Sequence, residues 1–311
     1  MANEASTTKI LITGANGMLG QKLVYAGLQD PNLDIIATGR CPNRLVQTQG
    51  YTYLEMSITD SERVHAVFQE HRPDVVINCA AITQVDYAEE NPSECWRVNV
   101  DAVKILLKAT AAVSGKFIQV STDFVFDGTQ EPYRETSVVN PVNYYGKSKA
   151  EAEKLVRKSG LAFGIVRTIL VYGVTDHLSR SNAVLWAIRS LREGKAIRVV
   201  EDQFRTPTLV EDLAAGILAI VRRNKKGTFH IAGKDRMSIH QLVIAVSEAF
   251  GLTNDAVTPV ATASLNEPAR RPPCTSFDLS KAKEHLDFEP RSFSEGLQLV
   301  AQQLEKITAQ P

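Results

Sequence analysis

The chain has 311 residues, of which 44% are hydrophobic and 23% are charged, as in an ordinary globular protein. Its 35 lysine and arginine residues balance 35 aspartate and glutamate residues, so we expect no nucleic-acid partner. No apolar run approaches the roughly eighteen residues of a membrane span, and we expect no membrane association. The four cysteines form no CxxC or histidine pairing, which predicts reduced thiols in a cytoplasmic protein and no metal site.

Short β-branched segments alternate with amphipathic segments in the first half of the chain. The expected strands are 9–13, 33–38, 52–54, 74–78, 116–121 and 162–167, and one expected helix spans 92–113. Because parallel neighbours need a crossover helix, the pattern predicts a doubly wound α/β fold with a parallel sheet. We expect a nucleotide-binding domain over 1–170, to which later strands return, and mainly a smaller α/β substrate lobe over 171–311.

A glycine-rich turn over 13–20 directly follows the first expected strand and opens a helix. Gly14, Gly17 and Gly20 give it GxxGxxG spacing around Asn16. Glycines let backbone amides at a helix N-terminus approach a pyrophosphate, so the turn favours dinucleotide binding on a Rossmann domain. A turn that serves only strand and helix packing is the alternative.

The end of the second strand indicates which dinucleotide would bind. An acid that binds a ribose 2′-hydroxyl is usual there, but this chain has Arg40, with Arg44 nearby. A guanidinium recognises a 2′-phosphate through two hydrogen bonds. We therefore expect NADP, although a solvated Arg40 would leave NAD open.

Two further strand ends reach the same edge of the sheet. Small residues at 78–81 would leave room for a nicotinamide ring, with Asn78 and Asn99 open to a structural role. Ser121 and Thr122 end a later strand, and either hydroxyl could bond a substrate carbonyl.

Tyr145 and Lys149 lie four residues apart on an expected helix over 143–158, so they share one face. Reduction of a carbonyl needs a proton donor, and a neighbouring cation lowers the pKa of a tyrosine. The pair predicts a reductase; a solvated pair on the helix surface is the alternative.

In this order, the motifs resemble the extended short-chain dehydrogenase/reductase superfamily. Within it, the segments 78–89, 121–129, 143–149, 202–208 and 271–272 resemble the dTDP-4-dehydrorhamnose reductase family. The resemblance implies NADPH-dependent reduction of the C4 ketone of a nucleotide-activated 6-deoxysugar, with dTDP-L-rhamnose as product. It implies that Tyr145 donates the proton, Lys149 holds the nicotinamide ribose and Thr122 tunes the carbonyl.

The remaining predicted contacts divide by ligand. The cofactor would contact Gly14, Asn16, Gly17, Met18, Leu19, Gly20, Arg40, Ala80, Ala81, Ile82, Thr83, Tyr145 and Lys149. The nucleotide sugar would contact Ser121, Thr122, Asp123, Arg205 and Arg271, with at least one of the two arginines clamping its diphosphate.

Several alternatives stay open. Where the family usually has a tryptophan, this chain has Ile169 and Leu170, so another nucleotide-sugar reductase or an epimerase is compatible with the sequence. Phe124 stands where related dehydratases have a glutamate, which disfavours dehydration. The non-catalytic β subunit of methionine adenosyltransferase resembles the same reductases, and a regulatory role is therefore a further alternative. The sequence fits a monomer or a homodimer.

Overall fold

The computed structural model describes residues 7–176 and 182–308. Its centre is a seven-stranded sheet in the order β11-β6-β5-β4-β1-β2-β3, with every neighbouring pair parallel. The strands are β1 (Thr8–Thr13), β2 (Leu33–Gly39), β3 (Thr52–Glu55), β4 (Val75–Asn78), β5 (Lys116–Thr122), β6 (Phe163–Thr168) and β11 (Gly227–His230). The predicted doubly wound α/β fold is confirmed.

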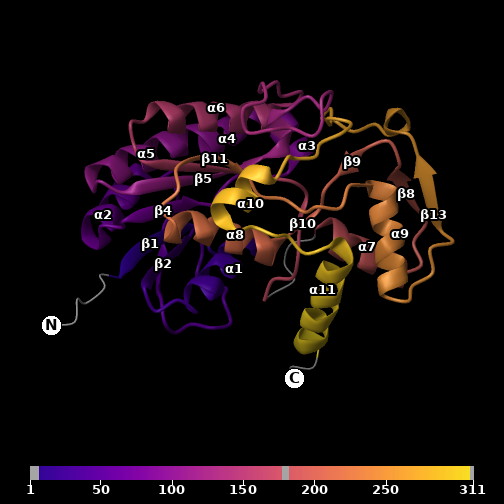
Figure 1. Cartoon of the computed structure of the whole chain (residues 1–311), viewed down its shortest axis with the longest axis horizontal. Helices are drawn as coiled ribbons and strands as arrows, with labels where there is room; N and C mark the ends of the chain where they lie inside the picture. Colours follow the sequence, from indigo (N-terminus) through magenta and orange to yellow (C-terminus); the bar gives the residue numbers. More distant parts are fainter. Residues whose placement is uncertain (1–6, 177–181, 309–311) are drawn as a thin grey trace.

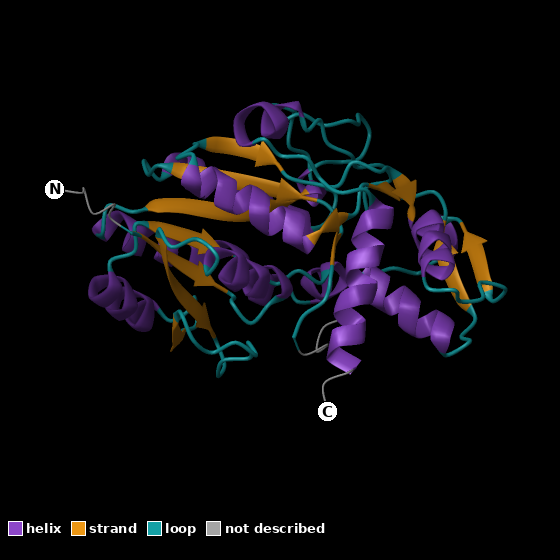
Figure 2. Ribbon diagram, turned by 60° about the horizontal axis from the view of Figure 1, so that its bottom comes forward, coloured by secondary structure: helices purple, strands orange, loops and turns teal. Residues whose placement is uncertain are grey.

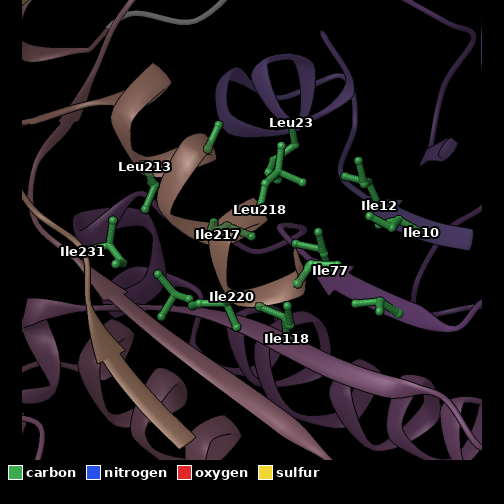
Figure 3. Packing of buried hydrophobic residues seen from close by; sticks show 14 of the residues in the cluster. Ile10, Ile12, Leu23, Ile77, Ile118, Leu213, Ile217, Leu218, Ile220 and Ile231 are labelled. Carbon is green, nitrogen blue, oxygen red and sulfur yellow. The ribbon is translucent and has the colours of Figure 1, made fainter. Parts of the chain in front are cut away.

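Helices cover both faces of this sheet (Figure 1). One face packs against α1 (Met18–Gly27), α8 (Val210–Arg222) and α10 (Ser280–Leu286), and the other against α2 (Ser61–His71), α5 (Ala102–Ala112) and α6 (Tyr144–Lys158). Figure 3 shows Leu23 of α1 and Ile217 of α8 packed over strand residues such as Ile10 and Ile77. Two apolar layers therefore hold the sheet rigidly and fix the positions of its strand ends.

The expected helix over 92–113 is interrupted. It consists of α4 (Pro92–Trp96), a π-helical turn over Arg97–Asp101 and α5. The apolar spacing predicted the helical path but not the π turn, because one inserted residue changes the hydrogen-bond ladder and hardly changes the pattern of apolar residues.

A smaller group of elements lies beside the sheet (Figure 2). It contains α7 (Ala183–Arg192), α9 (Ile239–Ala249) and α11 (Phe293–Thr308), which share an apolar cluster with Val199 of β8 (Ile197–Val200). Strand β8 pairs in parallel with β13 (Val257–Val260). The short strands β7 (Val171–Tyr172) and β10 (Thr208–Leu209) form one pair, and β9 (Phe204–Arg205) and β12 (Met237–Ser238) form another.

The remaining described elements are short: α3 (Val85–Glu90), a 3-10 turn over Asp123–Val125 and another over Thr262–Ser264. No helix within the described ranges is long and apolar enough to cross a membrane.

Candidate active site

The carboxyl ends of β1, β4 and β5 lie side by side in the sheet. Between β1 and β4 the strand order reverses direction, and open α/β sheets bind ligands outside such a switch point. The glycine turn follows β1, the small residues Cys79–Thr83 follow β4, and Thr122 ends β5. The fold thus brings three of the predicted segments to one crevice.

The glycine turn is shaped by close backbone contacts. Gly14 has a φ of 68°, and a Cβ there would lie 3.0 Å from the amide nitrogen of Ala80. A Cβ on Gly20 would lie 2.4 Å from the carbonyl oxygen of Gly14. Both positions therefore require glycine.

The start of α1 fits a diphosphate. Gly17 is its N-cap residue, and no side chain caps this end of the helix. A Cβ on Gly17 would approach only the carbonyl oxygen of Gly14, at 3.1 Å. The first amides of α1, including those of Met18 and Leu19, thus begin a helix without a side-chain acceptor, which is the arrangement that binds a phosphate of a dinucleotide.

Asn16 joins this turn to the loop after β2. Its Nδ2 donates to the Tyr53 hydroxyl at 2.8 Å and to the Pro42 carbonyl at 3.0 Å, while its Oδ1 accepts from the Arg44 amide at 3.0 Å. Arg40 lies exposed at the end of β2. Within residues 7–176 and 182–308 no side-chain partner occupies its guanidinium. Asn16 therefore holds the loop that carries both candidate 2′-phosphate arginines.

The loop after β4 is tied down from two sides. Thr13 Oγ1 donates to Asn78 Oδ1 at 2.6 Å, and the Ala80 amide donates to the same Thr13 oxygen at 3.3 Å. Asn99, on the π turn, accepts from the Ile82 amide at 2.8 Å and donates to its carbonyl at 3.0 Å. Both asparagines thus hold backbone, and Ala80, Ala81, Ile82 and Thr83 are left partly or fully exposed after β4.

Tyr145 and Lys149 are both buried on α6, 8% and 4% exposed. Lys149 Nζ donates to the Val120 carbonyl at 2.7 Å, and burial lowers the pKa of its ammonium to about 8. Burial also raises the pKa of Tyr145, against a hydrogen bond with Thr122. Desolvation of the phenol is the largest effect on this pKa, and a lowering of it by Lys149 stays a prediction.

The two hydroxyls at the end of β5 have different partners. Thr122 Oγ1 donates to Asp123 Oδ1 at 3.0 Å and accepts from the Phe124 amide at 3.2 Å, on the side of Tyr145. Ser121 Oγ instead donates to Glu153 Oε1 at 2.6 Å. The Ser121 hydroxyl is thus already engaged by Glu153 of α6. Its contacts are structural ones, contrary to the predicted substrate contact.

A buried ion pair lies behind this strand end. The Arg167 guanidinium donates to both oxygens of Glu153, at 2.8 and 2.7 Å, and both side chains are 1% exposed or less. Arg167 lowers the pKa of Glu153 against burial, which raises it. Sequence reasoning missed the pair. The signal that could have found it is the position of Glu153, which lies four residues after Lys149 and therefore shares its face of α6.

Arg205 has the contacts of a structural residue. Its guanidinium donates to the carbonyls of Phe204, Pro273 and Pro272 at 2.7, 3.1 and 2.6 Å. These bonds tie the segment at 204–205 to the loop at 272–273. They occupy the guanidinium donors that we expected to bind a diphosphate. The structure therefore argues against Arg205 as the clamp.

Arg271 lines a pocket of about 280 Å³ that also contains Asp202, Glu267 and Arg270. Its guanidinium pairs with Asp86 at 2.7 Å and with Glu267 at 2.9 Å. The carbonyl of Arg270 accepts from Nδ2 of Asn143, the N-cap residue of α6, at 2.8 Å. The pocket thus adjoins the start of the helix that carries Tyr145, and of the two predicted clamps Arg271 lines this pocket and Arg205 does not.

Comparison with known proteins identifies the family. A family model described as the RmlD substrate binding domain matches residues 8–306. The chain is 30% identical to the dTDP-4-dehydrorhamnose reductase of Aggregatibacter actinomycetemcomitans over 93% of this chain and 97% of that protein. It is 32% identical to the methionine adenosyltransferase 2 subunit beta of Bos taurus over 88% of this chain and 81% of that protein.

Solved structures agree with this. A dTDP-4-dehydrorhamnose reductase from Clostridium acetobutylicum superimposes with a TM-score of 0.84 at 33% identity, covering 96% of this chain and 100% of that one. The dTDP-4-dehydrorhamnose reductase of Bacillus anthracis, solved in complex with NADP, gives a TM-score of 0.83 at 28% identity with the same coverage. The resemblance and the enzyme class predicted from the sequence are confirmed: the chain is an NAD(P)-dependent oxidoreductase that belongs to the RmlD substrate-binding domain family of the extended short-chain dehydrogenase/reductase superfamily.

Proposed function

We propose that the protein reduces the C4 ketone of a nucleotide-activated 6-deoxy-4-ketosugar, with dTDP-4-dehydrorhamnose as substrate and dTDP-L-rhamnose as product. The observation that carries the proposal is the position of Tyr145 and Lys149, buried together on α6 beside the carboxyl end of β5. Relatives and solved structures named as dTDP-4-dehydrorhamnose reductases cover almost the whole chain. Because one fold can host different functions, these relatives support the proposal and the site residues carry it.

The chain's own residues have separate tasks in this reaction. When bound, the nicotinamide supplies the hydride. Tyr145 delivers a proton to the oxygen that becomes the C4 hydroxyl, since a positioned acid near the carbonyl speeds the reduction. Lys149, fixed by the Val120 carbonyl, would hold the nicotinamide ribose, and Thr122 would orient the carbonyl. The burial of Tyr145 and Lys149 would limit the access of water to the proton.

We infer that NADPH is the natural cofactor. The glycine turn and uncapped start of α1 suit a dinucleotide diphosphate, and Arg40 and Arg44 lie on the loop that Asn16 holds next to the turn. The Bacillus anthracis relative was solved in complex with NADP. The pocket at Arg271 would take a distal part of the sugar nucleotide.

Single-turnover oxidation of NADPH with saturating dTDP-4-dehydrorhamnose tests the reaction. Tyr145→Phe removes the proposed acid and should lower kcat by roughly 10²- to 10⁴-fold while NADPH still binds. Tyr144→Phe is the matched control, because Tyr144 lies on the same helix and its ring packs 6.2 Å from that of Trp96. It should leave kcat near the native value. A Tyr145→Phe protein that reduced the ketone at the native rate would exclude Tyr145 as the acid.

A second candidate is a role as a regulatory subunit. It is favoured by the 32% identity to the bovine methionine adenosyltransferase 2 subunit beta. Size-exclusion chromatography with a purified methionine adenosyltransferase catalytic subunit would decide between the candidates. Coelution, together with no oxidation of NADPH by any nucleotide 4-ketosugar, would replace the reductase proposal with the regulatory one.

A further inference from the structure

A chain of buried polar side chains crosses the sheet at the carboxyl ends of three strands. The register pairs Thr13 of β1 with Asn78 of β4, and Asn78 with Gln119 of β5. All three residues are 1% exposed or less. Thr13 Oγ1 donates to Asn78 Oδ1 at 2.6 Å, and Asn78 Nδ2 donates to Gln119 Oε1 at 2.9 Å. Gln119 Nε2 donates in turn to the Val120 carbonyl at 2.8 Å. Hydrogen bonds thus join the strand before the glycine turn to the end of β5.

The two ends of this chain fix the direction of its hydrogen bonds. At one end the Ala80 amide donates to Thr13 Oγ1 at 3.3 Å, and a backbone amide can only donate. At the other end the Val120 carbonyl can only accept. Each side-chain amide between them therefore accepts through its oxygen and donates through its nitrogen. Turning over the amide of Asn78 or Gln119 would set donor against donor and acceptor against acceptor, so each of these side chains has a single allowed orientation.

The Val120 carbonyl is also the acceptor of Lys149. Lys149 Nζ donates to it at 2.7 Å, and the residue is 4% exposed. Among the residues that the structure describes, this carbonyl is the one hydrogen-bond acceptor of the ammonium. An ammonium carries three protons, so two remain for a ligand. One backbone oxygen therefore sets the position of the Lys149 ammonium, and Gln119 bonds the same oxygen.

Packing alone does not explain a glutamine at this position. Its neighbours in β5, Ile118 and Val120, are apolar, and an apolar side chain at 119 would avoid the cost of burying an amide. Without Gln119, Asn78 Nδ2 would lose this acceptor and the Val120 carbonyl would lose a donor. The amide therefore adds a fixed link between Asn78 and the Val120 carbonyl.

We propose that Gln119 is a positioning residue for Lys149. It fixes the Val120 carbonyl that holds the ammonium, and it links this carbonyl through Asn78 and Thr13 to the glycine turn. The inference rests on the proposed function, in which Lys149 holds the nicotinamide ribose. With Gln119 in place, the two remaining protons of Lys149 meet the ribose of a dinucleotide whose diphosphate lies at the turn. Gln119 thus acts through Lys149 and not on the ligand.

NADPH binding in a double-mutant cycle tests this coupling without any ketosugar. Gln119→Met keeps the length of the side chain and removes its hydrogen bonds with Asn78 and Val120. It should weaken NADPH binding by about tenfold, because Lys149 loses its fixed position. Lys149→Met should weaken binding at least as much. In the Lys149→Met background, Gln119→Met should cause no further loss, since no ammonium remains to be positioned. Isothermal titration of the native protein and the three variants measures the four affinities.

Thr110→Val is the matched control, because Thr110 is buried on α5 and its hydroxyl donates to the Leu106 carbonyl at 2.7 Å. It should lower the Tm, as the loss of a buried hydrogen bond does, and leave the affinity for NADPH native. Losses from Gln119→Met and Lys149→Met that add, or a Gln119→Met protein with only its Tm lowered, would show a structural role and overturn the proposal. Native affinity for NADPH in Lys149→Met would overturn it as well. If Gln119→Met does not fold, Gln119→Asn replaces it in the cycle with the same expected result, because its shorter amide cannot bond both partners.

The reaction separates this inference from the proposed function. With dTDP-4-dehydrorhamnose and saturating NADPH, Gln119→Met should lower kcat by about tenfold and leave KM for the ketosugar unchanged, since Lys149 and not the sugar site is displaced. A raised KM with native kcat would assign Gln119 to sugar binding and overturn the proposal. If the native protein reduced no ketosugar, the proposed function would fail, while the NADPH cycle would still decide the coupling.

Discussion

The expected preference for NADPH rests first on Arg40, which follows β2. It is exposed beside the loop that Asn16 holds, and a 2′-phosphate would form a charge-assisted bond with its guanidinium. Arg40→Ala should weaken the binding of NADPH by about 1.5 to 3 kcal/mol, or roughly ten- to hundredfold in affinity. The affinity for NADH should be unchanged. Isothermal titration with both cofactors measures this difference.

Arg192→Ala provides the control for that experiment, because Arg192 lies in the last turn of α7 and away from the glycine turn. It should change neither affinity. Equal losses for NADPH and NADH in Arg40→Ala would assign Arg40 no part in recognising the phosphate.

For some single residues the sequence predicted the wrong contacts. The motif at the end of β5 predicted two hydroxyls in the crevice, but the Ser121 hydroxyl bonds Glu153, and only Thr122 is left near Tyr145. Arg205 had a suitable type and context for a clamp, yet its donors are taken by carbonyls from the distant loop at 272–273. Such pairings depend on long-range packing, which local patterns do not encode.

Among the elements, the strands of the first half were predicted to within one or two residues, since most of them are apolar runs that lie buried in the sheet. Strand β11 (Gly227–His230) was not assigned individually. It contains only four residues and two of them are polar, so only pairing with β6 identifies it as a strand. The expected helix over 143–158 is confirmed as α6, with Asn143 as its N-cap residue, which accepts from the Gly146 amide.

The loop between β5 and α6 is held by one carboxylate. Asp127 accepts from Asn140 Nδ2 at 2.9 Å, from the Thr129 amide at 3.0 Å and from the Tyr133 hydroxyl at 2.9 Å. The hydrogen bond from Asn140 is the largest of the effects that lower its pKa from 3.8 to about 2. The loop is thus fastened by an acceptor that must stay ionised.

Asp127→Asn should therefore lower the Tm near neutral pH. Because the folded pKa lies below the unfolded one, the stabilisation by Asp127 is complete above 3.8 and is lost as pH falls to about 2. Thermal unfolding across this range should show the native and Asp127→Asn curves converging at its acidic end. A difference in Tm that is constant with pH would mean that the ionised form of Asp127 is not what fastens the loop.

At the scale of the whole molecule, the two predicted domains share one core. Leu213 and Ile217 of α8, Ile231 and Phe288 pack in the same cluster as the residues of β1 and β4, under one face of the sheet. Strand β11 completes the sheet beside β6. The division at residue 170 stays a prediction about function, but the packing argues that it does not separate two folding units.

A fragment ending at residue 170 should therefore fail to fold. It would lack α8 and α10, which cover one face of the sheet, and it would expose the edge of β6 that β11 pairs in the whole chain. Exposed apolar faces and open strand edges favour aggregation. We expect the fragment to be insoluble or, if refolded, to show no cooperative thermal transition by circular dichroism, whereas the full chain should show one. A soluble fragment that melts cooperatively and binds NADPH with native affinity would establish the first 170 residues as an autonomous domain and would mean that the shared cluster is not required for its folding.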